Sequence, residues 1–205
     1  MIYHKPAGVA LPEPLLLAGL SLNRDGWGIM GFDPAGRLIL ERETAIDRAR
    51  LLHRVRLHRD AELVVHLRQI TRGGSHEDNA HPLEIGNGVY LMHQGTLPLE
   101  TLLPGRSDTW HFGELVLGPL LERDPGLVSD PALHRLLELA LREQNRMVLL
   151  STASRKIQVL NRRLGVEVEG VWISSPRWVD QRLYPIADAT PPQERSVSAE
   201  SVHFF

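Results

Sequence analysis

Two apolar runs in the first half of the chain each end in a histidine, His66 and His93, and then break into polar segments that contain glycine. Because proteins often place their chemistry where a rigid element gives way to a loop, we expect these segments to form one wall of a pocket. An arginine at a strand end suits a carboxylate, to which its guanidinium can donate two parallel hydrogen bonds. A glycine at such a place leaves its backbone N–H open to a ligand. The residues that this interpretation brings together are Arg68, Thr71, Asn79, His81 and Gly95.

Asp108 follows Ser107 at the predicted start of a helix. An acidic residue at this position interacts favourably with the helix dipole, and it can also bind a cationic group. Either role is compatible with the sequence around it.

Four histidines in the same region, at positions 66, 76, 81 and 93, suggest a metal site as an alternative. Their spacings match no zinc-binding pattern, and the chain contains no HExxH motif. We therefore expect no metal, and keep a histidine-rich metal-binding protein as one hypothesis.

The elements that would position these residues follow from hydrophobic periodicity and turn signals. The pattern predicts strands at 1–6, 25–33, 37–44, 61–68, 88–95, 146–152, 156–161 and 168–175. It predicts helices at 46–57, 107–123 and 129–145. Runs of strands separated from pairs of helices favour antiparallel sheets over alternating βαβ units. We expect one domain over residues 1–188 and an irregular polar tail over residues 189–205.

The composition excludes several classes of protein. A formal net charge of −2 gives no electrostatic signal for nucleic acid or an anionic membrane. The 205 residues contain no cysteine, so the chain has no disulfide, thiolate metal site or thiol nucleophile. The apolar patch at residues 15–20 is too short to span a membrane, and we expect a cytoplasmic location.

Taken in order, five segments resemble the class II glutamine amidotransferase domain, an N-terminal-nucleophile hydrolase. The segments are "NRDGWGIM", "HLRQITRGG", "NAHP", "LMHQG" and "SDT". The resemblance implies an α+β fold, a four-layer αββα sandwich with two mainly antiparallel sheets, and no cofactor. It also implies that residues 2–5 lie in a sheet next to the strands that carry His66 and His93.

The resemblance further implies roles for the pocket residues. Arg68, with Thr71, would bind the α-carboxylate of glutamine, and Asp108 would bind its α-ammonium. Gln94 and Gly95 would occupy the oxyanion-hole position. The pocket would be supported by His66, Asn79, His81 and His93. The implied ligand is glutamine or another α-amino acid, and a protein partner remains open.

Two departures from the family pattern bear on activity. The family nucleophile is an N-terminal cysteine, which this chain lacks, so we assign no catalytic residue. The oxyanion amide comes from Gln94 where the family has asparagine, and oxyanion donors must lie about 2.7–3.1 Å from the developing charge. One hypothesis is a catalytically inactive amidotransferase-like protein that acts by binding. The other is an active glutaminase or amidohydrolase whose true N-terminal cysteine lies upstream of Met1.

Overall fold

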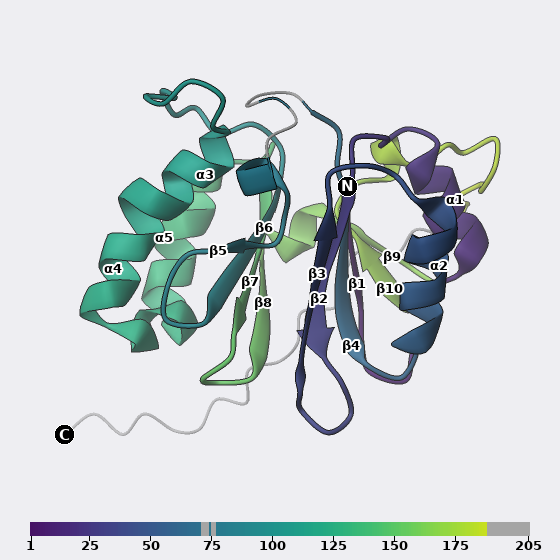
Figure 1. Ribbon diagram of the computed structural model, residues 1–205, viewed down its shortest axis with the longest axis horizontal. Coiled ribbons are helices and arrows are strands. Elements are labelled where there is room, and N and C mark those ends of the chain that lie inside the picture. The colour runs from purple at the N-terminus through teal and green to yellow at the C-terminus, as the bar shows by residue number, and fades with distance from the viewer. Residues whose placement is uncertain (71–73, 75–76, 188–205) are drawn as a thin grey trace.

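A computed structural model describes residues 1–70, 74 and 77–187, and ten strands in these residues form two antiparallel sheets. The six-stranded sheet has the order β3-β2-β4-β1-β10-β9, and the four-stranded sheet has the order β5-β6-β7-β8 (Figure 1). The first contains β1 (Ile2–Lys5), β2 (Trp27–Phe32), β3 (Leu38–Glu43), β4 (Glu62–Leu67), β9 (Val166–Val168) and β10 (Val171–Ile173). The second contains β5 (Leu83–Glu84), β6 (Val89–Gln94), β7 (Arg146–Ser151) and β8 (Lys156–Leu160).

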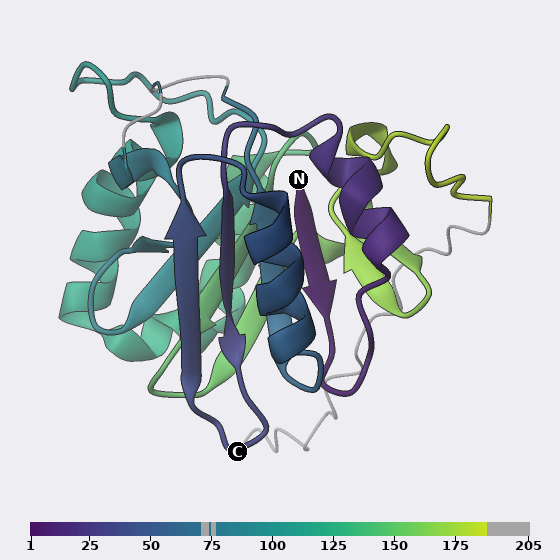
Figure 2. The same cartoon turned by 45° about the vertical axis from the view of Figure 1, so that its right-hand side comes forward.

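Helices cover the outer face of each sheet. The helices α1 (Glu13–Leu20) and α2 (Arg48–Leu57) lie across the six-stranded sheet, as Figure 2 shows. The four-stranded sheet carries α3 (Asp108–Phe112), α4 (Gly118–Arg123) and α5 (Pro131–Leu141). Shorter turns are η1 (Glu77–Asn79), the π-helical η2 (Gly113–Leu117), η3 (Pro125–Ser129), η4 (Arg162–Leu164) and η5 (Pro176–Trp178). Of the described helices, none has the length and apolar character that crossing a bilayer requires.

Three layers of buried apolar side chains hold these four layers of secondary structure together. Leu15, Leu51 and other residues fill the space between α1, α2 and the six-stranded sheet. Leu141 and Leu149 belong to the layer under α3 to α5. Trp172, with residues such as Met92, fills the space between the two sheets. The predicted α+β, four-layer αββα sandwich is confirmed.

Residues 2–5 lie in a sheet as predicted: β1 pairs with β4, which carries His66, and contacts β6 of the facing sheet, which carries His93. Two local predictions need correction. The strand predicted over 168–175 is instead the hairpin of β9 and β10, because Glu169 and Gly170 both adopt positive φ, as a tight hairpin turn requires. The helix predicted over 107–123 is divided by a π-helical turn. The predicted tail, residues 189–205, lies outside the described residues.

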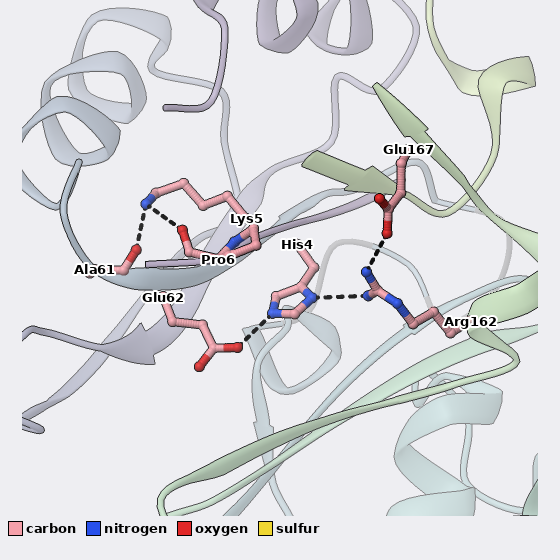
Figure 3. A network of polar contacts seen from close by, with 7 residues as sticks. All are labelled: His4, Lys5, Pro6, Ala61, Glu62, Arg162 and Glu167. Carbon is pink, nitrogen blue, oxygen red and sulfur yellow. Dashed lines mark hydrogen bonds and ion pairs between the residues drawn. The ribbon is translucent and has the colours of Figure 1, made fainter. Parts of the chain in front are cut away.

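A polar network also joins the two sheets (Figure 3). His4 of β1 contacts the carboxylate of Glu62 through Nε2 at 2.9 Å. Arg162, which comes shortly after β8, approaches Nδ1 of His4 at 3.2 Å and donates to Glu167 at 2.8 Å. Arg162 follows the four-stranded sheet in sequence, whereas the other three residues belong to the six-stranded sheet, so the network fixes one sheet against the other.

Candidate functional site

A cavity of about 530 Å³ opens where loops from both sheets meet. It is lined by residues that follow β4 and β6, by the start of α3 and by the turn between α5 and β7. The predicted site residues among its lining are His66, Arg68, Asn79, His81, His93, Gln94, Gly95 and Asp108. The fold therefore brings every described site residue to one place. Thr71 and the alternative metal ligand His76 lie outside the described residues.

Arg68 continues the strand pairing just beyond β4. Its N–H donates to the carbonyl of Gly26 at 2.9 Å, and its own carbonyl accepts from Asp25 N–H at 3.0 Å. The side chain is 6% exposed, and Nη2 donates to the carbonyl of Gly74 at 2.5 Å. Burial lowers the pKa of Arg68, an effect that Asp25 opposes. Nη1 is buried and has no hydrogen-bond partner among the described residues. The guanidinium is thus a buried cation with one donor group unsatisfied.

Asp108 lies in the first turn of α3, after Ser107, which is the N-cap and accepts a hydrogen bond from Trp110 N–H. One carboxylate oxygen of Asp108 accepts from Leu97 N–H at 2.5 Å and the other from Thr109 N–H at 3.0 Å. No ion pair joins Asp108 to Arg68 in the part of the chain that the structure describes. The two charged groups therefore line one cavity without neutralising each other through direct contact.

His93 stands at the centre of a buried hydrogen-bond chain. Asn145 donates through Nδ2 to the carbonyl of Leu141, so its Oδ1 faces His93 and accepts from Nε2–H at 3.0 Å. Nδ1 of His93 then accepts from the hydroxyl of Thr109 at 2.8 Å. Burial lowers the pKa of His93 to about 4, against the opposing effects of Asp108 and Asn145. His93 is a neutral imidazole that connects β6, α3 and the turn before β7.

Gln94 and Gly95 form the turn that ends β6. Gly95 has a φ of 132°, and a Cβ there would lie 2.2 Å from Oδ1 of Asn145 and 2.8 Å from the carbonyl of Gln144. Only glycine fits this turn. The side-chain oxygen of Gln94 is buried and makes no hydrogen bond.

His66 and His81 pack edge to face, with ring centroids 4.4 Å apart. Within the part of the chain that the structure describes, Nδ1 of His66 and both ring nitrogens of His81 lack a hydrogen-bond partner. Burial is the main cause that lowers the pKa of each ring, so both are neutral near pH 7. Asn79 accepts from Ser107 N–H and donates to the carbonyl of Gly105, both at 2.7 Å. Asn79 thus holds the loop that leads into Asp108.

The metal hypothesis receives no geometric support here. Across residues 1–70, 74 and 77–187, no group of three or more histidine, aspartate or glutamate side chains could hold a metal ion.

Sequence reasoning missed several residues of this site. The structure adds Asn23, Arg142, Gln144, Asn145 and Trp178 to the cavity lining. Asn23 opens the motif "NRDGWGIM" but was assigned no role, whereas the other four come from the turn after α5 and the segment after the last strand, far from the motifs in sequence. No local pattern in the sequence marks them.

Comparison with known proteins gives two matches. A family model described as glutamine amidotransferases class-II matches residues 17–150, more than half of the chain. A solved structure, glutamine phosphoribosylpyrophosphate (PRPP) amidotransferase from B. subtilis complexed with ADP and GMP, superimposes with a TM-score of 0.51 at 15% sequence identity. The match covers 83% of this chain and 40% of that one, and at this identity it shows the fold alone. A search of curated proteins found no match.

Proposed function

The chain belongs to the class II glutamine amidotransferase family, and from this premise we propose that its cavity binds glutamine or another α-amino acid without hydrolysing it. The observation that carries the proposal is that Arg68 and Asp108 line one cavity and form no ion pair with each other. A zwitterionic amino acid offers a carboxylate for the first residue and an ammonium for the second. Charge-assisted hydrogen bonds of this kind are the strong ones.

Arg68 and Asp108 can each form further hydrogen bonds to such a ligand. Nη1 of Arg68 is a buried donor without a partner, and an unsatisfied buried donor costs about 1–3 kcal/mol, more when it is charged. A bound carboxylate would remove that penalty. Asp108 already accepts two backbone N–H groups, but an ionised carboxylate has about four acceptor sites. Its remaining lone pairs suit an ammonium group.

We propose the absence of hydrolysis because of the groups that would act as nucleophile and oxyanion-hole donor. The sequence contains no cysteine, and the thiol of a cysteine is the family nucleophile. The hydroxyl of Thr109 is committed to His93, and the hydroxyl of Ser107 caps α3. Gln94 supplies a longer amide than the asparagine of the family pattern, and its oxygen is buried without a partner. We assign the cavity a role in recognition.

Calorimetric titration with glutamine, alongside a glutaminase assay, tests the proposal. We expect binding without turnover. Arg68→Ala and Asp108→Asn should each weaken binding more than tenfold, since a hydrogen bond to a charged group contributes about 1.5–3 kcal/mol. Because Arg68 and Asp108 do not pair, Arg68→Ala should cost little thermal stability. The exposed Arg48→Ala on α2 serves as a control and should change neither property. A large drop in melting temperature for Arg68→Ala, with no binding by the parent protein, would leave Arg68 a purely structural residue.

The competing hypothesis of an active glutaminase has its own test. Met1 lines the cavity, so a cysteine carried at position 1 after removal of an initiator methionine would reach the site. If Gln94 also prevents turnover, this cysteine alone should give no glutaminase activity, whereas the cysteine combined with Gln94→Asn should gain it. Turnover with the cysteine alone would favour the active enzyme.

A further inference from the structure

The charges around the cavity do not balance when a neutral amino acid is bound. Among the described lining residues the permanent charges are the cations Arg68 and Arg142 and the anion Asp108. Burial lowers the pKa values of the lining histidines and of the α-amine of Met1, so these groups are uncharged near pH 7. An α-carboxylate and an α-ammonium would satisfy Arg68 and Asp108. Arg142 would then remain without a counter-charge.

The side chain of Arg142 has no partner within the described part of the protein. Its guanidinium makes no hydrogen bond or ion pair with a described residue, although Glu138 and Glu143 are close in sequence. Glu138 is engaged elsewhere, by Arg135 and by the N–H of Asn161. The side chain of Arg142 is exposed at the cavity wall.

The backbone of Arg142 is held in a conformation that few residues other than glycine adopt. Its φ of 56° and ψ of −169° lie at the edge of a region used almost only by glycine. Asn161 fixes it by donating through Nδ2 to the Arg142 carbonyl at 2.8 Å. The residues that follow, Gln144 and Asn145, pack directly against Gly95. Backbone strain of this kind concentrates at binding and active sites, and here it lies next to the turn that ends β6.

The cavity is also larger than a free amino acid needs. Its volume is about 530 Å³. It falls within the range of about 300–1,000 Å³ that is usual for sites that take larger ligands. Arg142, Gln144 and Trp178 line the same cavity as Arg68 and Asp108, so a ligand with its head group at the latter two has these residues as further candidate contacts.

We propose that the ligand is an α-amino acid that carries a second anionic group at the far end of its side chain, and that Arg142 binds this group. The inference rests on the proposed binding of an α-amino acid and specifies in addition that this ligand carries a net negative charge. Suitable chemistry is a side-chain carboxylate, as in glutamate, or a carboxylate placed further out on an amide-linked extension, as in γ-glutamylglycine.

Glutamine and glutamate have nearly the same shape and differ by one negative charge, so they form a matched pair for calorimetry with the intact chain. We expect the parent protein to bind glutamate, γ-glutamylglycine or both at least about fivefold more tightly than glutamine, the effect of one partly exposed ion pair at the upper end of its range. A preference for glutamate over γ-glutamylglycine would place the second anion on a short side chain. The reverse order would place it on an extended one.

Variants at position 142 test whether the positive charge of Arg142 causes the preference for the acidic ligand. Arg142→Ala should abolish the preference for the acidic ligand, so that it binds no more tightly than glutamine does. Arg142→Glu should make the acidic ligand the weaker one, and Arg142→Lys should keep most of the preference. Arg48→Ala, which removes an exposed arginine on α2 that does not line the cavity, is the control and should leave the preference intact. Melting curves establish that each variant is folded.

The outcomes distinguish this inference from the proposed function. Binding of glutamine as tight as that of both acidic ligands would overturn the inference alone. If the preference survives both Arg142→Ala and Arg142→Glu, another residue binds the second anionic group of the ligand. That result would also overturn the inference. Failure of every amino acid to bind would overturn the proposed function and the inference together.

Discussion

At the scale of single residues, the side chain of His93 links the two parts of the proposed binding site through hydrogen bonds. It accepts from Thr109, the neighbour of Asp108 in sequence, and donates to Asn145, which packs beneath Gly95. Both halves of the proposed site therefore depend on one imidazole that has both ring nitrogens occupied. A protonated ring would have to donate from Nδ1 as well, and would carry a charge into a fully buried position. The neutral form of His93 is thus part of the fold.

We expect the buried histidines to make the protein sensitive to acid. The pKa values of His66, His81 and His93 lie below the ordinary value near 6.5, that of His93 at about 4. Between pH 6.5 and 4 the unfolded chain therefore binds more protons than the folded one, so the free energy of unfolding is highest above pH 6.5 and falls as the pH drops through this window. Urea denaturation at several pH values measures the slope.

Substitution of His93 by glutamine should make this slope shallower, while lowering stability at pH 7.5 because the bonds to Thr109 and Asn145 are disturbed. The same change at the exposed His53 controls for the loss of a surface histidine. An unchanged slope in His93→Gln would show that His93 does not contribute to the acid response.

At the scale of elements, the segment that forms one wall of the cavity packs directly against strand β2. Gly28 pairs with Arg42 on one side and with His66 on the other. A Cβ at Gly28 would lie 1.9 Å from the carbonyl oxygen of His81. The segment that carries His81 can therefore rest directly on β2 only because the strand has no side chain at that point. This close approach brings His81 against His66.

Gly28→Ala should accordingly damage both stability and the site. Displacing the backbone at His81 should lower the free energy of unfolding by about 1–3 kcal/mol, as overpacking in a tightly packed region does. It should also weaken amino acid binding, because the cavity wall moves. Titration calorimetry and urea denaturation give the two values.

Gly8→Ala is the contrasting control for this prediction. Gly8 has a positive φ of 75°, unlike Gly28, and no described atom lies within 4 Å of the position that a Cβ would take, so this change adds backbone strain without a steric clash. This change should cost about 1–2 kcal/mol through backbone strain and leave binding unaltered. Full binding by Gly28→Ala would mean that the position of His81 is unimportant for the cavity.

At the scale of the whole molecule, the two sheets carry separate parts of one site. Arg68 follows β4 in the six-stranded sheet, and Gln94 ends β6 in the four-stranded sheet. Their relative position depends on the apolar layer around Met92 and Trp172 and on the network of His4 and Arg162 (Figure 3). The site therefore exists only when both sheets are packed together.

We propose that residues 1–188 form the domain, with residues 189–205 dispensable to it. The described core is complete by Val179, with Tyr184 and Ile186 packed at its edge. A chain that ends at residue 188 should thus change the free energy of unfolding by less than about 0.5 kcal/mol and keep its ligand affinity.

A chain that ends at residue 175 is the contrasting case, since it removes Trp178 from the cavity and Val179 from the core. It should lose several times as much stability and bind less tightly. A marked loss of stability on removing only residues 189–205 would contradict the proposed domain boundary.

The sequence by itself determined many of the elements and the family, although it did not predict α1 or β5. Short apolar runs predicted β4 and β6, and the ends of these runs indicated Arg68 and Gly95, because strand propensity and turn chemistry depend on neighbouring residues. Gln94 was indicated by the family resemblance. The ordered motifs predicted the class II amidotransferase fold, which the sheets and the family match confirm.

Only the tertiary structure decided which charged residues lie in the same cavity. It showed that Arg68 and Asp108 share a cavity without pairing, that His93 bonds to Thr109 of α3 and to Asn145, and that Asn145 and Arg142 contribute to the lining. These relations join residues that are distant in the chain, and they depend on strand register and on how two sheets pack. Neighbouring residues in a sequence do not encode such distances, because many packings are compatible with the same local pattern until the buried side chains select one.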